Sequence, residues 1–473
     1  MGRKAKKDLP LLEKVEITGL AAEGKAMARV SDKVLFVPFA APGDIADIRV
    51  KRSRRQYMEG EVVRFHKYSP DRTKPFCLHF GVCGGCKWQH LPYQWQLEQK
   101  QQQLTDSLRR IGKIDTDRVH AEAIIPSRQT TFYRNKLEFT FSDRRWLTRD
   151  EIDTGREIHN MQALGFHVPG QYDKVLDIEK CWLQPEPSNQ IRLAVKEFAI
   201  ASGLTFFDLR ANRGLLRNLI IRNTEAGEVM AIVVFGEDSP GGIHKMMGFL
   251  HETFPHLHTL AYVVNEKANS SLDGLDPVIY AGRPYMEESL EGLRFRIGPK
   301  TFFQTNSSQA GRLYSVAREF AGLTGNEVVY DLYTGTGSLG CFVASGAKAL
   351  VGIEYVEEAV GHARCNARVN QIGNAAFFAG DVAGVLNEDF MKAKGFPQVI
   401  IADPPRAGMH PAVLQQILKS GARRLVYVSC NPATQARDIE LLSAAYRVSR
   451  ARAVDMFPHT QHVESVVLLE KKC

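Results

Sequence analysis

The chain has 473 residues, 44% hydrophobic and 24% charged, which is the composition of a soluble globular protein with roughly two to four domains. No stretch approaches the ~18 consecutive apolar residues of a membrane span, and the basic start MGRKAKKDLP lacks the apolar core of a signal peptide, so we expect a cytoplasmic protein without membrane association. The net charge of +8 lies partly in two basic clusters, residues 3–7 and 49–57, which favour a polyanionic partner or form solvated surfaces.

Short alternating or apolar segments fill the first part of the chain. Strand patterns occur in KVEITGL, KVLFVPF, DIADIRVKR and EGEVVRF, and the PGD tripeptide at residues 42–44 is a turn signal. We therefore predict that residues 1–68 form a small barrel of the OB type, a fold that commonly binds nucleic acid.

Residues 69–295 mix strand-like and helical segments, which predicts a central α+β domain. Strand patterns such as KLEFTFS, ALGFHV and VMAIVVFG alternate with helical patterns such as IRLAVKEFAI. Apolar residues recur at helical spacing between residues 92 and 111, where we predict a helix that packs on the domain formed by residues 296–473.

Four cysteines of this central region need a chemical explanation. Cys77, Cys83 and Cys86 stand in CLHFGVCGGC with the spacing C-x5-C-x2-C, and Cys181 follows far along the chain. Disulfides are not expected in a long chain without a secretory signal. Three clustered thiols and one remote thiol suit an iron–sulfur cluster or a zinc site, and the spacing alone does not separate these two centres.

Strands and helices alternate regularly over residues 296–473. The strand segments EVVYDLY, KALVGIEYV, FPQVIIADPP, RLVYVSC and SVVLLEK are nearly continuous apolar runs. Such runs are typical of a parallel sheet that helices cover on both faces. We predict an α/β fold here, with a doubly wound, Rossmann-like catalytic domain.

A glycine-rich loop follows the first strand of this domain. The segment DLYTGTGSLG places Gly335, Gly337 and Gly340 between a strand and a helix, where the backbone can turn tightly and approach a ligand. The next strand ends at Glu354, placed to hold a ribose, and Asp381 follows the strand after it, placed to meet an adenine edge. The pattern is similar to the S-adenosylmethionine loop of doubly wound methyltransferases, with another nucleotide-binding Rossmann domain as the alternative.

The segment DPPRAG follows the fourth strand of the domain. Its two prolines predict a stiff, extended turn beside the cofactor pocket. Asp403 can accept a hydrogen bond there, and the cation of Arg406 would suit a substrate that becomes anionic. The alternative for Arg406 is a surface charge on a turn.

Cys430 ends the next strand, in LVYVSCNPAT, and is a candidate core residue, metal ligand or nucleophile. Beside a methyl-donor site, a thiolate solves the problem of methylating pyrimidine C5: it adds to C6, and the resulting O4–C5 enolate attacks the methyl sulfonium. Glu464 is the candidate base that then removes the C5 proton. His459 and His462 flank Glu464 and are expected to be hydrogen-bonded polar residues without a catalytic role.

Five motifs in a fixed order carry a family resemblance: FFQTN (302–306), DLYTGTG (331–337), DPPRAG (403–408), YVSCNPAT (427–434) and HVESVVLL (462–469). Through them the chain resembles the bacterial uracil-5 RNA methyltransferases, and specifically the 23S ribosomal RNA branch. The first 65 or so residues are similar to the RNA-binding TRAM domain of that family, through AAEGKAMARV and VPFAAPGD.

The resemblance implies roles for individual residues. Cys430 would be the nucleophile and Glu464 the general base, with Asp403 and Arg406 as further catalytic residues. S-adenosylmethionine would contact Gln304, Tyr333, Gly335, Glu354, Asp381 and Asp403. A [4Fe–4S] cluster, rather than zinc, would be bound by Cys77, Cys83, Cys86 and Cys181.

The sequence thus predicts an enzyme that methylates C5 of a uridine in 23S ribosomal RNA, with no obligate protein partner. One alternative is the same chemistry on another ribosomal uridine or on transfer RNA. The other is an RNA-binding module that has lost catalysis, and the presence of Cys430, Glu464 and Asp403 argues against it.

Overall fold

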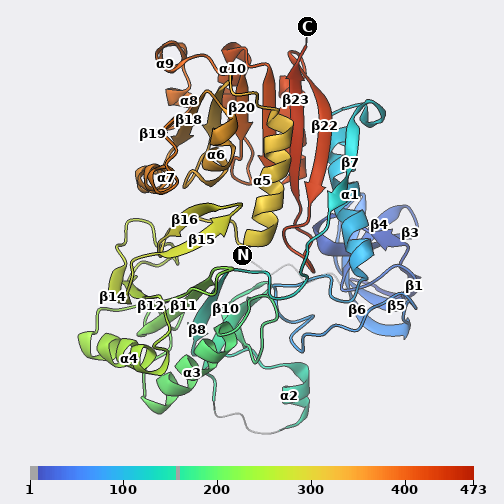
Figure 1. Cartoon of the computed structure of the whole chain (residues 1–473). Helices are drawn as coiled ribbons and strands as arrows, with labels where there is room; N and C mark the ends of the chain where they lie inside the picture. Colours follow the sequence, from blue (N-terminus) through green and yellow to red (C-terminus); the bar gives the residue numbers. More distant parts are fainter. Residues whose placement is uncertain (1–8, 156–159, 473) are drawn as a thin grey trace, which may run out of the picture. The chain divides into compact units, whose positions relative to one another are not determined.

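A computed structural model of the chain describes residues 9–155 and 160–472 (Figure 1). The basic cluster at residues 3–7 lies outside these described residues. The chain divides into a first unit, residues 1–103 with 457–462, and a second unit, residues 104–456 with 463–473. Within the described ranges, no helix is both long enough and apolar enough to cross a lipid bilayer.

The first unit contains a six-stranded sheet in the order β1-β5-β6-β4-β3-β2. Its strands are β1 (Leu11–Glu16), β2 (Gly19–Leu20), β3 (Lys25–Val30), β4 (Lys33–Pro38), β5 (Ile45–Ser53) and β6 (Tyr57–Lys67). The long pair β5 and β6 shifts register three times, and such bulges bend a sheet toward closure. Ala26, Leu35 and Ile48 pack in the buried interior. The predicted OB-type barrel is confirmed.

The second unit contains a seven-stranded sheet in the order β10-β9-β8-β11-β12-β13-β14. Its strands are β8 (Lys136–Ser142), β9 (Ala163–Val168), β10 (Gln171–Asp177), β11 (Leu216–Asn223), β12 (Val229–Phe235), β13 (Thr259–Val264) and β14 (Val278–Gly282). The helices of this region are α2 (Arg149–Asp153), α3 (Ser188–Ala201) and α4 (Pro240–Thr253), and a hairpin follows, β15 (Met286–Leu290) and β16 (Leu293–Ile297). This is the predicted α+β arrangement.

The same unit contains an eight-stranded sheet in the order β19-β18-β17-β20-β21-β23-β22-β7. Its strands are β7 (His120–Ile125), β17 (Val328–Leu332), β18 (Ala349–Glu354), β19 (Ala375–Ala379), β20 (Val399–Ala402), β21 (Arg424–Ser429), β22 (Tyr446–Val454) and β23 (Glu464–Lys471). Strands β17 to β21 pair in parallel, and β23 is antiparallel to both of its neighbours. The order reverses at β17, so the predicted doubly wound sheet is confirmed.

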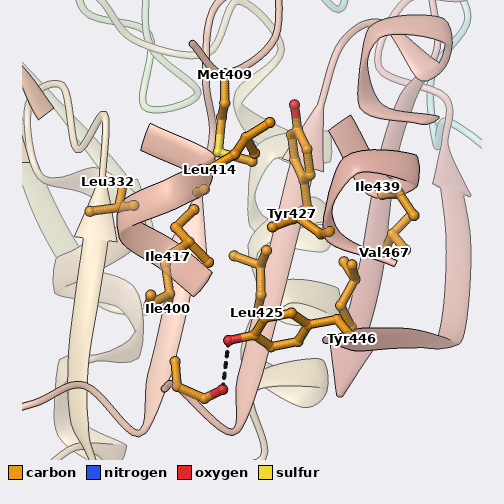
Figure 2. Close-up of a cluster of buried hydrophobic side chains, with 14 of the residues drawn as sticks. Leu332, Ile400, Met409, Leu414, Ile417, Leu425, Tyr427, Ile439, Tyr446 and Val467 are labelled. Atoms are coloured by element: carbon orange, nitrogen blue, oxygen red, sulfur yellow. Dashed lines mark hydrogen bonds between the residues drawn. The ribbon is translucent and has the colours of Figure 1, made fainter. Parts of the chain in front are cut away.

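Helices cover both faces of this sheet. They are α5 (Ser307–Ala321), α6 (Ser338–Val343), α7 (Glu357–Val369), α8 (Val382–Val385), α9 (Glu388–Lys394), α10 (Pro411–Ser420) and α11 (Pro432–Leu442). On one face, α5 contacts β21, β22 and β23 (Figure 1). On another part of the sheet, Ile417 of α10 and Ile439 of α11 pack with Leu425 of β21 (Figure 2). Buried side chains of this kind account for the continuous apolar runs in the sequence.

The predicted helix near residues 92–111 is α1 (Tyr93–Arg110), which runs across the boundary between the two units. Its last two turns belong to the second unit, where Leu104 and Leu108 are almost completely buried in the core of the eight-stranded sheet. Leu104 and Leu108 are two of the apolar residues whose spacing between residues 92 and 111 predicted the helix.

The edge strand β7 comes from the region that the sequence pattern assigned to the central domain. It pairs in parallel with β22, with His120 opposite Arg450 and Ile125 opposite Val454, and Figure 1 shows the two strands side by side. A strand of six residues carries no local signal for a partner that follows hundreds of residues later. The catalytic sheet therefore extends beyond the predicted bounds of residues 296–473.

Candidate active site

The carboxyl ends of parallel strands meet at one edge of a sheet, and most predicted site residues follow such ends. Asp403 directly follows β20, and Cys430 directly follows β21. Glu464 is the first residue of β23, which pairs with β21 so that Ser465 faces Ser429. Cys430 follows Ser429 and Glu464 precedes Ser465, so this antiparallel register places Cys430 and Glu464 opposite each other.

The Cys430 thiol is half-buried among charged side chains. Its pKa is raised to about 11, chiefly by burial and then by the negative charge of Glu464, with a smaller contribution from Asp403. The Arg406 guanidinium opposes this rise by its charge and a hydrogen bond. Arg406, which is exposed to solvent, is thus the group that stabilises the thiolate.

Glu464 and Asp403 form a carboxyl pair beside this thiol. Glu464 is 5% exposed, and burial followed by the Asp403 charge raises the pKa of its carboxyl well above the usual range, against the pull of Arg406. The pKa of Asp403 is raised to about 7 by burial and by Asp331. Two carboxyl groups with such perturbed acidity beside a nucleophile are able to hold and move a proton.

The glycine loop after β17 is held by the acid at the end of β18. The Gly335 N–H donates to one oxygen of the Glu354 carboxylate and the Val356 N–H to the other, both at 3.0 Å. Gly335 has φ of 55°, and a Cβ added to it would have no atom within 4 Å, so the loop borders open space. Tyr333, with φ of 63°, shares the left-handed conformation, which is strained for a residue with a side chain.

Asp331 lies beneath this loop with 1% of its surface exposed. Its carboxylate accepts hydrogen bonds from the Thr334 hydroxyl and from the Gly340 N–H, and a Cβ on Gly340 would come within 2.7 Å of it. Burial raises the Asp331 pKa to about 7, although both hydrogen bonds oppose that rise. The carboxylate therefore sets the shape of the loop.

The segment that carries Gln304 is held by residues that the sequence reasoning missed. Asn135 donates from Nδ2 to the Gln304 carbonyl at 2.8 Å, and Arg222, fully buried on β11, donates from Nη1 to the carbonyls of Gly298 and Thr301. The Thr336 hydroxyl of the glycine loop donates to the Phe302 carbonyl at 3.3 Å. Nothing local marked Asn135 or Arg222, because their partners lie far away in the sequence.

Asp381 and Tyr314 complete the surroundings of the loop. Asp381 is exposed, and its carboxylate caps α8 by accepting from the Ala383 N–H at 3.3 Å. Tyr314 on α5 is 2% exposed, and its hydroxyl lies 2.8 Å from Ser338 Oγ. Burial, Asp403, Asp331 and Glu464 all raise the pKa of this tyrosine, so its hydroxyl stays protonated beside the carboxyl groups.

Three of the four cysteines predicted as metal ligands stand on a turn-rich segment of the first unit. Cys77, Cys83 and Cys86 are half-buried, and Cys181 belongs to the second unit. Backbone N–H groups of His79 and Phe80 point at the Cys77 sulfur, as the Gly85 N–H does at the Cys83 sulfur at 3.4 Å. Such amide-to-sulfur contacts stabilise a thiolate and suit a thiolate-bound centre.

Across residues 9–155 and 160–472, no three Cys, His, Asp or Glu side chains form a group that could hold a metal ion. The four-thiol iron–sulfur site therefore stays a prediction.

The second basic cluster lies on the barrel of the first unit. Its cations are all exposed, on β5 and the turn after it: Arg49, Lys51, Arg52, Arg54 and Arg55. Lys51 pairs with Glu61 at 2.5 Å, and Arg52 lies 3.8 Å from Glu59, so part of the positive charge is balanced locally. In the same unit, the backbone N–H of His459 donates to Gln96 Oε1 at 2.8 Å, and its ring Nδ1 lies 3.3 Å from Gln96 Nε2. The ring contact fits the expectation of a hydrogen-bonded histidine.

Comparison with known proteins places this arrangement in a family. A family model described as tRNA (Uracil-5-)-methyltransferase matches residues 279–472, and one described as TRAM domain matches residues 13–63. A relative from Bacteroides thetaiotaomicron is 53% identical over 95% of this chain and 100% of its own length, and one from Porphyromonas gingivalis is 51% identical over 96% and 99%. Both are named uncharacterized RNA methyltransferases.

A solved structure is similar over nearly the whole chain. The Pyrococcus abyssi tRNA (uracil-54, C5)-methyltransferase, solved in complex with S-adenosyl-L-homocysteine, is 27% identical, with a TM-score of 0.73 over 96% of this chain and 100% of that chain. The strand order and the glycine loop agree with these similarities in indicating a methyltransferase fold. The chain therefore belongs to the RNA methyltransferases of the tRNA (uracil-5-)-methyltransferase family and carries an N-terminal TRAM domain.

Proposed function

We propose that this enzyme methylates C5 of a uridine in 23S ribosomal RNA, in the cytoplasm, with S-adenosylmethionine as the methyl donor. The observation that carries the proposal is the register of β21 and β23, because it brings Cys430 and Glu464 to the same edge of the sheet. Arg406 and Asp403 act electrostatically on both groups. A nucleophile, a base and a cation are what C5 methylation of a pyrimidine requires.

The proposed reaction begins with the thiolate of Cys430, which forms a bond to C6 of the uracil. The C5–C6 π electrons move onto the O4–C5 enolate, and C5 then takes the methyl group. S-adenosylmethionine would supply that methyl group as an electrophile: the bond between the methyl carbon and the sulfonium sulfur breaks, and its electron pair stays on sulfur in the released S-adenosyl-L-homocysteine. Glu464 removes the proton from C5, the C5–C6 double bond re-forms, and the Cys430 thiolate leaves. Arg406 stabilises the thiolate before addition and after elimination.

The methyl donor would be held by the residues around the glycine loop. The open space at Gly335 and the Glu354 carboxylate, whose oxygens keep free lone pairs for ribose hydroxyls, fit such a ligand. The other proposed contacts are Gln304, Tyr333, Asp381 and Asp403. The complex of the Pyrococcus abyssi relative with S-adenosyl-L-homocysteine supports the assignment.

We also propose that Cys77, Cys83, Cys86 and Cys181 bind a [4Fe–4S] cluster. The support is the thiol spacing and the amide groups directed at the Cys77 and Cys83 sulfurs. The cluster has no part in the steps above, and its proposed role is to order the segment that holds it.

Transfer RNA is the second candidate substrate. The observation that favours it is the similarity, along the full chain, to an enzyme named for uracil 54 of tRNA. The chemistry at Cys430 would be the same for either RNA, so the two candidates differ only in the molecule that carries the uridine.

One experiment tests the proposal and separates the two substrates. Nucleosides of 23S ribosomal RNA and of transfer RNA are mapped by mass spectrometry in cells with the protein, without it, and with its Cys430→Ala variant. We expect one 5-methyluridine of 23S ribosomal RNA to disappear in the last two strains. If 5-methyluridine is lost from transfer RNA alone, transfer RNA is the substrate. Unchanged methylation in both RNAs would refute the proposed function.

A further inference from the structure

The turn after β20 is fastened to helix α11 by side chains that the mechanism does not use. The turn carries Arg406, and α11 starts two residues after the Cys430 thiol. The four side chains that reach from the start of α11 to the backbone of the turn are Asn431, Thr434, Arg437 and Asp438. The catalytic cation and the nucleophile are therefore joined through this helix.

The tightest connection is made to the main chain of Arg406 itself. Its carbonyl oxygen accepts from Asn431 Nδ2 and from Thr434 Oγ1, each at 3.1 Å. The Thr434 hydroxyl also lies 3.1 Å from the Asn431 carbonyl, so its single proton serves two acceptors. Asn431 is the stronger partner of the two, since its amide donates to the turn while its Oδ1 caps the helix at Ala433 N–H, 3.2 Å away.

A second connection fixes the far end of the turn. Asp438, which is fully buried, accepts from the Met409 N–H and from the Tyr427 hydroxyl, both at 2.7 Å. Arg437 donates to the Ala407 carbonyl at 2.9 Å and also to Asp438. A Cβ on Gly408, at φ +81°, would lie 2.6 Å from Asp438 Oδ2, so the turn and the helix are in close contact.

The position of the Arg406 backbone decides where its guanidinium lies. The guanidinium is hydrogen-bonded to the Cys430 thiol, and it is exposed, so packing alone does not hold it there. The other charged groups that act on the thiol are Glu464 of β23 and Asp403 of the same turn, and both disfavour the thiolate. A small displacement of the turn would leave these two carboxyl groups unopposed.

We propose that Asn431 and Thr434 are positioning residues that keep the Arg406 guanidinium on the Cys430 thiol by holding the Arg406 carbonyl. The proposal rests on the proposed function, since it assigns a purpose to that thiol. Asn431 and Thr434 would then control the reactivity of the Cys430 thiol, in addition to the role of Asn431 as the helix cap.

The variants separate positioning from capping. Asn431→Ser keeps an N-cap oxygen of comparable strength and loses the reach to Arg406. Thr434→Val removes the hydroxyl at similar volume, and Thr434→Ser retains it as the matched control. Each is made alone and in an Arg406→Gln background, where the guanidinium is absent.

The measurement is the rate of alkylation of Cys430 by iodoacetamide in the full-length protein between pH 7 and 9.5. The rate is followed by mass spectrometry of the tryptic peptide 425–437, whose single cysteine is Cys430. Below the thiol pKa the rate follows the thiolate fraction, so we expect Asn431→Ser and Thr434→Val to slow alkylation by about threefold to tenfold. Thr434→Ser should react like the wild type, and Cys365 on α7 provides an internal control within each sample.

The outcome depends on whether the effects require Arg406. If Asn431 and Thr434 act through the guanidinium, Asn431→Ser and Thr434→Val have no further effect in the Arg406→Gln background. Equal slowing in both backgrounds, or no slowing in either, overturns the proposal. Because alkylation needs neither RNA nor methyl donor, this result is independent of whether Cys430→Ala retains methyl transfer, which is the test of the proposed function itself.

Discussion

Gly340 and Asp331 lie in contact across the glycine loop: the Gly340 N–H donates to the Asp331 carboxylate, and a Cβ at residue 340 would lie 2.7 Å from Asp331 Oδ2. The same Cβ would come within 3.2 Å of Leu350 Cδ2 on the neighbouring strand. Only glycine leaves room for the buried carboxylate to hold the loop in its present form.

Gly340→Ala is therefore expected to lower the free energy of unfolding by about 1–3 kcal/mol and to weaken the binding of S-adenosylmethionine. Urea unfolding measures the first effect and titration calorimetry the second. Gly361→Ala on α7 is the matched control, because no atom lies within 4 Å of its added Cβ. This exposed helical position should gain up to about 1 kcal/mol. Unchanged cofactor affinity in Gly340→Ala would show that the loop does not depend on the contact.

Cys430→Ala should abolish methyl transfer and leave S-adenosylmethionine binding nearly unchanged. The thiol lies after β21, whereas the glycine loop and Glu354 belong to β17 and β18, so the substitution removes the nucleophile without touching that loop. Filter assays with labelled methyl donor measure the first property and calorimetry the second. Turnover that persists in the variant would remove Cys430 from the role of nucleophile.

Glu464→Gln should trap the enzyme on its RNA. Without a base to take the C5 proton, the Cys430–C6 bond of the methylated intermediate cannot break, and a covalent complex accumulates. The variant should fold, because glutamine resembles the neutral form that burial favours by raising the Glu464 pKa. A band of RNA-linked protein on a denaturing gel, absent in the Cys430→Ala/Glu464→Gln double variant, is the expected result.

The ionisation of Asp331 should make the second unit less stable at high pH. Its folded-state pKa is raised to about 7 from 3.8, so the folded state binds more protons than the unfolded state between these values. Its contribution is fully present below pH 3.8 and is lost as the pH rises through about 7. Asp331→Asn, which cannot ionise, should remove this decline, which amounts to about 3 kcal/mol between pH 5 and 8. Parallel curves of unfolding free energy for the two proteins from pH 5 to 8 would contradict the assignment.

The cysteine set should make the protein brown when it is purified without oxygen. A [4Fe–4S] cluster predicts about four iron and four sulfide ions per chain and a broad absorbance in the visible range. Cys83→Ser should lose the iron, while Cys365→Ser, at a half-buried cysteine outside the set, should keep it. Stoichiometric zinc in the wild-type protein would refute the iron–sulfur cluster and assign the four cysteines to a zinc site, which their spacing also allows.

The parts of the site that could be predicted from the sequence are those whose signal is local. Apolar runs marked the strands, and Asp403 and Cys430 were recognisable because they stand at the ends of such runs, where parallel sheets bind their ligands. The glycine loop was visible because a tight turn between strand and helix needs residues without a Cβ.

The parts that could not be predicted depend on contacts between distant residues. Asn135 holds the Gln304 carbonyl across 169 positions, and the pairing of Ser429 with Ser465 aligns Cys430 with Glu464. The periodicity of apolar residues does not reveal such pairs, because it reports on the local secondary structure of each segment and not on its distant partner. The same holds for the Asn431 amide, whose bond to the Arg406 carbonyl joins two segments that no local pattern relates.

The pairing of β7 with β22 has a consequence for how the protein is made. Arg450 binds Glu122 across this edge of the sheet, 328 positions apart in the chain. At about 5–20 residues per second, a ribosome finishes β22 roughly 15–65 s after β7. For that interval β7 has no partner strand, and unpaired edges of this kind template aggregation. The catalytic sheet is thus one of the last structures to close during synthesis, and its assembly should depend on chaperones that shield the waiting strand.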